Sequence, residues 1–182
     1  MATTFTPFPD IGNACPEFTL PAVDGRTYSL KDFSNGKPLV VVFICNHCPY
    51  VKAIEDRLIT LGSDLKAQGV NVVAICSNDA ADHPEDSFEN LQKRAKEKNY
   101  SFTYLHDESQ AVAHKFGAVC TPDYFVYDGS LKLTYRGRLD DSWKDPAKVT
   151  KRELYEAVQV LLKNGIVSDD QTASMGCSIK WK

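Results

Sequence analysis

The feature that most constrains the fold is a pair of continuous apolar runs separated by a helical pattern. "PLVVVFIC" (38–45) and "VNVVAIC" (70–76) are rich in β-branched residues and carry no charge. Uninterrupted runs of this kind are typical of strands that are buried on both faces of a sheet. Apolar residues between them recur at spacings of three and four, which predicts an amphipathic helix. These residues are Val51, Ile54, Leu58, Leu61 and Leu65. Pro49 falls in the first turn of that helix, where proline is tolerated.

The segments on either side alternate between strand and helix patterns. A β-hairpin is predicted in "FTLPAVDGRTYSL" (18–30), with its turn at Asp24-Gly25. A helix is predicted within 77–99, where the acidic Glu85 and Asp86 would lie at its positively polarised start. A short strand, a short helix and a pair of strands follow at 101–105, 108–117 and 123–138.

The last predicted helix has a capping box, formed by Thr150 and Glu153, at its start. Strands separated by helices imply a parallel sheet, and the late strand pair adds antiparallel strands. We therefore expect an α/β fold: one domain over 1–182, with a central mixed β-sheet flanked by helices, an N-terminal hairpin and a helix-containing insertion. The segment 166–182 reads as a C-terminal tail docked on this domain, with Ile179 and Trp181 alternating with lysines as in an edge strand.

Composition narrows the class of function. The 182 residues hold 21 basic and 24 acidic side chains, so the net charge of -3 gives no field suited to nucleic acid. No apolar stretch is long enough to span a bilayer, and the start has no pattern of a secretory signal. We therefore expect a cytoplasmic protein with neither a nucleic acid nor a membrane as partner. The six cysteines do not have the spacing of a dense disulfide framework, and most should be thiols.

Cys45 and Cys48 lie at the carboxyl end of the first buried strand, where a helix begins. Chemistry collects at this end of open α/β sheets. A helix N-terminus stabilises a thiolate, which is the reactive form of cysteine. We expect Cys45 to be the attacking thiolate, Cys48 to be the less exposed resolving thiol, and His47 between them to tune the pKa. This spacing brings two sulfur atoms within bonding range.

Two other interpretations of the pair remain open. The first is two buried cysteines without chemistry, since cysteine is often buried as a small apolar residue. The second is a metal site, which Cys45, His47, Cys48 and Cys120 could form together. No second C-x-x-C and no H-x-x-x-H is present to complete an ordinary zinc site.

Thr121-Pro122 stands directly before a predicted strand, where a proline is accepted because it lacks a ladder donor. A cis bond here would leave backbone groups free to pair with a substrate strand. Cis proline is uncommon, so the residues alone favour a trans bond.

The chain resembles the thioredoxin superfamily through Cys45-Asn46-His47-Cys48-Pro49 after a strand and Thr121-Pro122 before the closing strand pair. It is similar to the redoxin branch, which includes the alkyl hydroperoxide reductase and thiol-specific antioxidant (AhpC/TSA) proteins and the TlpA-like proteins. "FICNHCPYVKAIEDRL", "TPDYFVYD", "YRGRLDDS" and "GCSIKWK" resemble an uncharacterised bacterial thioredoxin-like family. The resemblance implies a thioredoxin fold, a redox dithiol at Cys45 and Cys48, and a cis Pro122 that shapes a substrate groove with Thr121.

The chain departs from its relatives in two places. The cysteine pair encloses Asn-His, whereas thioredoxin itself has Gly-Pro there, and Ile44 precedes the pair where thioredoxin has a tryptophan. The peroxiredoxin signature P-x-x-x-T-x-x-C is absent, because Cys45 occupies its threonine position relative to Cys48. Direct peroxidase chemistry is therefore an alternative rather than the first expectation.

Two further cysteines are candidate accessory thiols. Cys120 precedes Thr121-Pro122 and is expected near the pair, either as an inert residue or as a third thiol. Cys177 lies in the tail and could exchange with Cys45 or Cys48, or be inert. His83 is expected on the surface or at a helix cap.

The sequence thus predicts a thiol-disulfide oxidoreductase that uses a Cys45–Cys48 couple and has no organic cofactor, since no phosphate- or dinucleotide-binding glycine motif is present. Its expected partners are protein or small-molecule thiols and disulfides, together with an electron donor. A thiol peroxidase and a metal-binding or metal-delivery module are the alternatives.

Overall fold

The computed structural model describes residues 3–7 and 10–182. A central five-stranded sheet has the order β6-β5-β4-β8-β9. Its strands are β4 (Leu39–Phe43), β5 (Asn71–Cys76), β6 (Thr103–His106), β8 (Asp123–Tyr127) and β9 (Leu133–Tyr135). β4 pairs in parallel with β5, and β5 with β6, whereas β8 runs antiparallel to both β4 and β9. The predicted mixed sheet is therefore confirmed.

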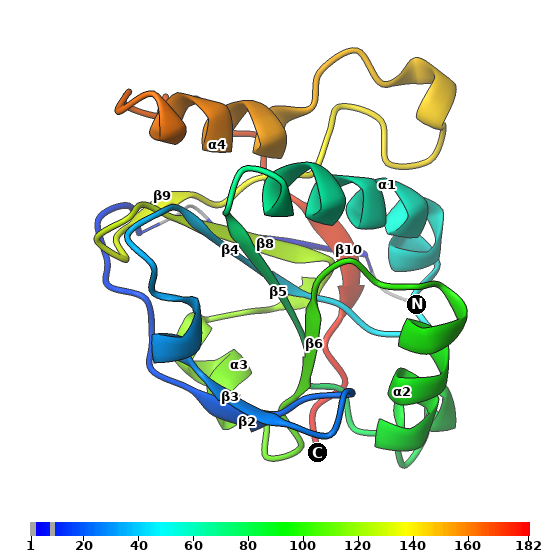
Figure 1. The fold of residues 1–182 in the computed structure, drawn as a ribbon. Helices are drawn as coiled ribbons and strands as arrows, with labels where there is room; N and C mark the ends of the chain where they lie inside the picture. The colour runs from blue at the N-terminus through cyan, green and yellow to red at the C-terminus, as the bar shows by residue number, and fades with distance from the viewer. Residues whose placement is uncertain (1–2, 8–9) are drawn as a thin grey trace.

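Helices and a hairpin cover the two faces of this sheet (Figure 1). The helices are α1 (Pro49–Lys66), α2 (Phe88–Glu97), α3 (Ala111–Phe116) and α4 (Glu153–Leu162). Figure 1 shows α1 and α4 over one face, and α3 with the hairpin of β2 (Thr19–Pro21) and β3 (Thr27–Ser29) over the other. Short 3-10 helices lie at Leu30–Phe33, Pro84–Asp86 and Pro146–Lys148.

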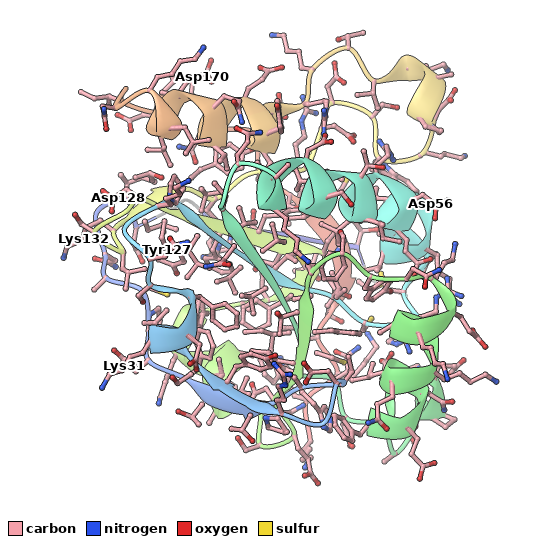
Figure 2. The ribbon with its side chains drawn as sticks, in the orientation of Figure 1. Lys31, Asp56, Tyr127, Asp128, Lys132 and Asp170 are labelled. Atoms are coloured by element: carbon pink, nitrogen blue, oxygen red, sulfur yellow. The ribbon has the colours of Figure 1, made fainter. Side chains whose placement is uncertain are left out.

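β4 is buried along its whole length because both layers pack against it. Alternate residues enter different cores: Val40 and Val42 pack with α1, and Val41 and Phe43 pack with α3 and the hairpin. This double burial is the physical reason for the continuous apolar run. Charged side chains such as Lys31, Asp56 and Asp170 lie exposed at the periphery (Figure 2). No helix in the described part of the chain is both long and apolar enough to cross a membrane.

A second, three-stranded sheet has the order β1-β10-β7. Its strands are β1 (Thr3–Phe5), β7 (Cys120–Thr121) and β10 (Met175–Ser178). β10 is antiparallel to both neighbours, with Cys177 opposite Thr3 on one side and Thr121 on the other. The tail strand thus falls at 175–178 rather than 179–182, and it is central rather than an edge strand, because β1 covers its outer side.

Two helix starts differ from the sequence predictions. The predicted capping box of the last helix is wrong, because Thr150 donates to the Asp141 carboxylate instead and Arg152 occupies the N-cap position of α4. The helix within 77–99 begins at Phe88, capped by Ser87. Asp86 belongs to the preceding 3-10 helix, and its side chain is fully buried rather than exposed at a helix start.

Candidate functional site

The two cysteines of the C-x-x-C segment lie where β4 gives way to α1. Cys45 comes two residues after β4, and Cys48 is the N-cap residue of α1, followed by Pro49 in the first helical turn. Neither thiol is open to solvent: Cys45 is 1% exposed and Cys48 is 0% exposed. The expected difference in exposure between them is therefore absent.

Asp86 organises the loop that carries the pair. One of its carboxylate oxygens accepts hydrogen bonds from the backbone N–H groups of Asn46, at 2.7 Å, and His47, at 3.2 Å. The other accepts from the Asn78 amide at 2.9 Å and lies 2.6 Å from Nδ1 of His47. A buried carboxylate needs donors of this kind to offset the loss of water. Asp86 is thus a site residue that sequence reasoning missed, because 39 residues separate it from His47.

His47 is fixed by Asp86 and His83. Its ring stacks on His83 with centroids 4.0 Å apart, so His83, which occupies the N-cap position of the 3-10 helix Pro84–Asp86 as the capping expectation had it, also borders the site. Nδ1 lies 3.6 Å from Sγ of Cys45 as well as close to Asp86. Since a carboxylate only accepts, the ring carries its proton at Nδ1 and points this N–H at Asp86 and Cys45. Nε2 is buried without a hydrogen-bond partner among the described residues.

Charge in the pair favours Cys48. Donors to its sulfur come from the thiols of Cys45 and Cys177 and from the backbone N–H groups of Val51 and Cys177. The hydrogen bond with Cys45 is the largest of these effects, and together the donors outweigh the burial of the sulfur and lower the pKa of the Cys48 thiol to about 5. Hydrogen bonds to the charged form favour it, and the N-terminus of α1 acts in the same direction.

The expectation that Cys45 is the attacking thiolate stays a prediction, and the hydrogen bonds of the reduced pair place the negative charge on Cys48 instead. Burial is the main cause that raises the pKa of Cys45, and the hydrogen bond that it donates to Cys48 and the nearby Asp86 carboxylate add to it. The Thr121 hydroxyl, 3.3 Å from Cys45 Sγ, opposes this only partly. The helix begins at Pro49, so its first N–H groups are close to Cys48, and the N–H of Val51 is one of the donors to the Cys48 sulfur.

The Thr121-Pro122 bond is cis, as the resemblance implied. The backbone beside it is not free, however, because β7 pairs with β10 of the same chain. The two strands lie so close at Gly176 that a Cβ atom there would overlap the Thr121 carbonyl oxygen. The expectation of an open backbone edge for a substrate strand is therefore wrong for this structure.

The accessory cysteines separate into two kinds. Cys177 on β10 is buried, and its Sγ lies 3.0 Å from Sγ of Cys48. The thiol of Cys120 instead donates to the Pro122 carbonyl at 3.6 Å, and burial raises its pKa. Burial also raises the pKa of Cys15 and Cys76 to about 12. Among the accessory thiols, Cys177 is thus the one that touches the pair.

Possible metal ligands at this site are Cys45, His47 and Asp86, whose ligand atoms all lie within 4.8 Å of one another. The predicted set instead contained Cys48 and Cys120, which the structure does not group with them. The Asp86 oxygens and the His47 Nδ1 already bond to each other and to the loop. A metal would have to replace those bonds, so the metal-binding alternative stays a prediction without support from this geometry.

A pocket of about 170 Å³, lined by apolar and aromatic side chains together with Arg138, Asp140 and Asp141, lies beside the site. Its wall includes Phe5, Tyr50, Ile54, Pro122, Tyr124 and Trp143. The rings of Tyr50 and Trp143 have centroids 4.4 Å apart. The Tyr124 hydroxyl is buried without a hydrogen-bond partner among the described residues. Tyr50 and Pro122 connect the pocket to the dithiol. Tyr50 follows Cys48 by two residues, and Pro122 directly follows Thr121, whose carbonyl oxygen contacts the Cys48 sulfur.

Comparison with known families decides the class of this site. The model of the AhpC/TSA family matches residues 11–136, which include both cysteines and Pro122. The chain belongs to the AhpC/TSA family. Peroxiredoxin Bcp of Escherichia coli is one of its relatives. The two are 29% identical over 126 residues, which cover 68% of this chain and 76% of peroxiredoxin Bcp. Thiol:disulfide interchange protein DsbE of Tatumella citrea is 28% identical over 147 residues, covering 74% and 70%.

Solved structures agree with this assignment. An uncharacterised conserved protein from Geobacillus kaustophilus is 44% identical, with a TM-score of 0.94 over 100% of this chain and 97% of that one. The thioredoxin domain of a Bacteroides vulgatus thiol-disulfide oxidoreductase is 18% identical, with a TM-score of 0.63 over 83% and 96%. The thioredoxin fold and the redoxin branch are thereby confirmed. At family level the chain is a redoxin of the thiol-disulfide oxidoreductase or peroxiredoxin-like kind.

Proposed function

We propose that this AhpC/TSA protein is a thiol-disulfide oxidoreductase in which Cys45 and Cys48 alternate between dithiol and disulfide. The observation that carries the proposal is the hydrogen bond between the two thiols at the start of α1, which favours a thiolate on Cys48. A thiolate beside a protonated thiol is the reduced state that disulfide exchange requires.

The exchange begins at Cys48 rather than at Cys45. The Cys48 thiolate attacks one sulfur of a substrate disulfide, whose other sulfur leaves and takes a proton from solvent. The Cys45 thiol then attacks the Cys48 sulfur, loses its proton to the departing substrate sulfur and closes the Cys45–Cys48 disulfide. The substrate gains two electrons and two protons, and the pair loses two electrons.

His47 supports the second half of the exchange. Its Nδ1–H lies 3.6 Å from Cys45 Sγ, where it stabilises negative charge as the Cys45 proton departs. Asp86 holds the ring in that orientation, with Oδ2 2.6 Å from Nδ1. His47 and Asp86 are therefore positioning residues for Cys45.

The substrate is a protein or small-molecule disulfide that presents an apolar group beside its sulfur. Since β10 occupies the backbone edge of β7, recognition falls to the pocket at Pro122. Its volume of about 170 Å³ suits one aromatic ring, since a cavity of about 150 Å³ is known to bind benzene. Because both thiols are buried, the exchange requires a local opening of the site.

Turnover of an aromatic disulfide with dithiothreitol as reductant tests the function. Cys48→Ser should lose multiple-turnover exchange, whereas Cys76→Ser, which alters a buried thiol on β5, should keep the rate of the unaltered protein. Exchange that persists in Cys48→Ser would overturn the proposal.

A second candidate function is thiol peroxidase, favoured by the low pKa of a fully buried Cys48 that a small oxidant can reach more easily than a protein can. The Cys48 thiolate would attack one peroxide oxygen and become a sulfenic acid, while the other oxygen leaves as hydroxide or alkoxide and takes a proton from solvent. A neighbouring thiol would then attack the Cys48 sulfur, release water and form a disulfide. Peroxide consumption with dithiothreitol at a kcat/KM more than tenfold above that for disulfides would favour this candidate.

A further inference from the structure

The tail strand β10 carries a third thiol to the dithiol. Register places Cys177 opposite Thr121, the residue whose carbonyl and hydroxyl oxygens contact the sulfur atoms of Cys48 and Cys45. Sγ of Cys177 and Sγ of Cys48 are 3.0 Å apart, and both side chains are buried. A disulfide bond is about 2.05 Å long, so a relative shift of roughly 1 Å would form one.

The position of Cys177 is fixed by the fold rather than by a loose terminus. β1 and β7 flank β10 on both sides. Beyond the strand, Lys180 exchanges hydrogen bonds with Asn78 and Asp79 at 2.9 and 2.7 Å. Trp181 stacks on His114 with centroids 4.2 Å apart. A terminal segment tied down in this way holds its side chains in register with the site.

We propose that Cys177 is a third redox thiol of this site, which forms a disulfide with Cys48 in exchange for the Cys45–Cys48 disulfide. The inference rests on the proposed function for the oxidised pair that it consumes. Cys177 loses its proton and attacks the Cys48 sulfur, the Cys45–Cys48 bond breaks, and Cys45 leaves as a thiolate that takes up the proton. The two oxidising equivalents stay in the protein, so the step needs no outside oxidant or reductant.

This relay has a defined consequence for the site. Cys48 is the shared sulfur, and its partner is either Cys45 in the loop or Cys177 on β10. Transfer to Cys177 returns Cys45 to the thiol state beside His47 while the start of α1 becomes covalently joined to the tail strand. The strand that occupies the β7 edge is thus also the internal acceptor of the disulfide.

Disulfide mapping by mass spectrometry tests the relay. Unaltered protein, Cys45→Ser, Cys177→Ser and the control Cys120→Ser are equilibrated in glutathione buffers of stepped potential, quenched with acid and alkylated. Cys120 is a suitable control because it is also a buried cysteine, on the strand β7 that pairs with β10. Its thiol donates a hydrogen bond to the Pro122 carbonyl rather than contacting Cys48. We expect Cys48–Cys177 in Cys45→Ser, Cys45–Cys48 in Cys177→Ser, and both pairs in the unaltered and control proteins.

The outcomes separate the two proposals. If Cys45→Ser leaves Cys48 and Cys177 as thiols, or Cys48 forms only a glutathione adduct, the third thiol is refuted while Cys45–Cys48 in Cys177→Ser still supports the proposed function. If Cys177→Ser forms no Cys45–Cys48 disulfide but Cys45→Ser forms Cys48–Cys177, the dithiol couple and the relay that consumes it both fail, and Cys177 is the direct redox partner of Cys48. Thiol labelling of the unaltered protein, which needs no substitution, should show Cys45 accessible to alkylation at potentials where Cys48 and Cys177 are blocked.

Discussion

Removing the Cys177 thiol should weaken the Cys48 thiolate by a predictable amount. The pKa of Cys48 is lowered to about 5, and the thiol of Cys177 is one of the donors that lower it. At pH 7, two units above that pKa, thiolate should exceed thiol by about 100 to 1. A hydrogen bond to a charged group contributes about 1.5–3 kcal/mol, and one pKa unit corresponds to about 1.4 kcal/mol. Cys177→Ala should therefore raise the pKa of Cys48 by about 1–2 units.

The ultraviolet absorbance of the thiolate measures this shift without requiring access to a buried sulfur. The transition is assigned to Cys48 by its disappearance in Cys48→Ser, and Cys120→Ala serves as the matched control, with an unchanged midpoint expected. The unaltered protein should titrate near pH 5 and Cys177→Ala near pH 6–7, because the helix terminus and the Cys45 donor remain. A Cys48 midpoint near the ordinary thiol value of 8–9 in the unaltered protein, or no shift in Cys177→Ala, would refute the reasoning.

Three further substitutions test other parts of the site. Asp86→Asn replaces a carboxylate oxygen, which accepts hydrogen bonds from the loop, by an amide group that cannot accept them all. It should lower the free energy of unfolding, measured by urea denaturation, by about 2–3 kcal/mol. An unchanged value would mean that Asp86 does not hold the loop. Gly176→Ala places a methyl group against the Thr121 carbonyl and should cost about 1–3 kcal/mol and speed amide hydrogen exchange in β10; exchange as slow as in the unaltered protein would contradict the tight strand contact. Trp143→Ala opens the pocket and should raise KM for an aromatic disulfide several-fold while leaving KM for oxidised glutathione unchanged; equal effects on both substrates would refute the recognition role.

The main elements of the fold could be predicted from the sequence because each follows from a local pattern. The two apolar runs, the helix that begins at Pro49, the hairpin around Asp24-Gly25 and the strand pair within 123–138 all occur as predicted. Local patterns failed at Thr150, where a plausible capping box lost to a hydrogen bond with Asp141. Capping motifs are weak signals that a nearby acceptor can override.

The site was less predictable because its energetics depend on contacts between distant segments. The pair Cys45 and Cys48 could be found from spacing, but the distribution of charge between them depends also on Asp86 and Cys177, which lie in distant parts of the chain. Asp86 follows an acidic pattern that also suits an exposed helix start. Only the folded chain reveals that its carboxylate faces inward to His47.

The most direct test of the central proposal is a redox titration of the unaltered protein in glutathione buffers, with differential alkylation and mass mapping of every cysteine. We predict one reversible two-electron transition in which Cys48 becomes linked to Cys45 or Cys177, while Cys15, Cys76 and Cys120 stay thiols throughout. Cys48 that remains a thiol at every potential would contradict the proposal that this site exchanges disulfides.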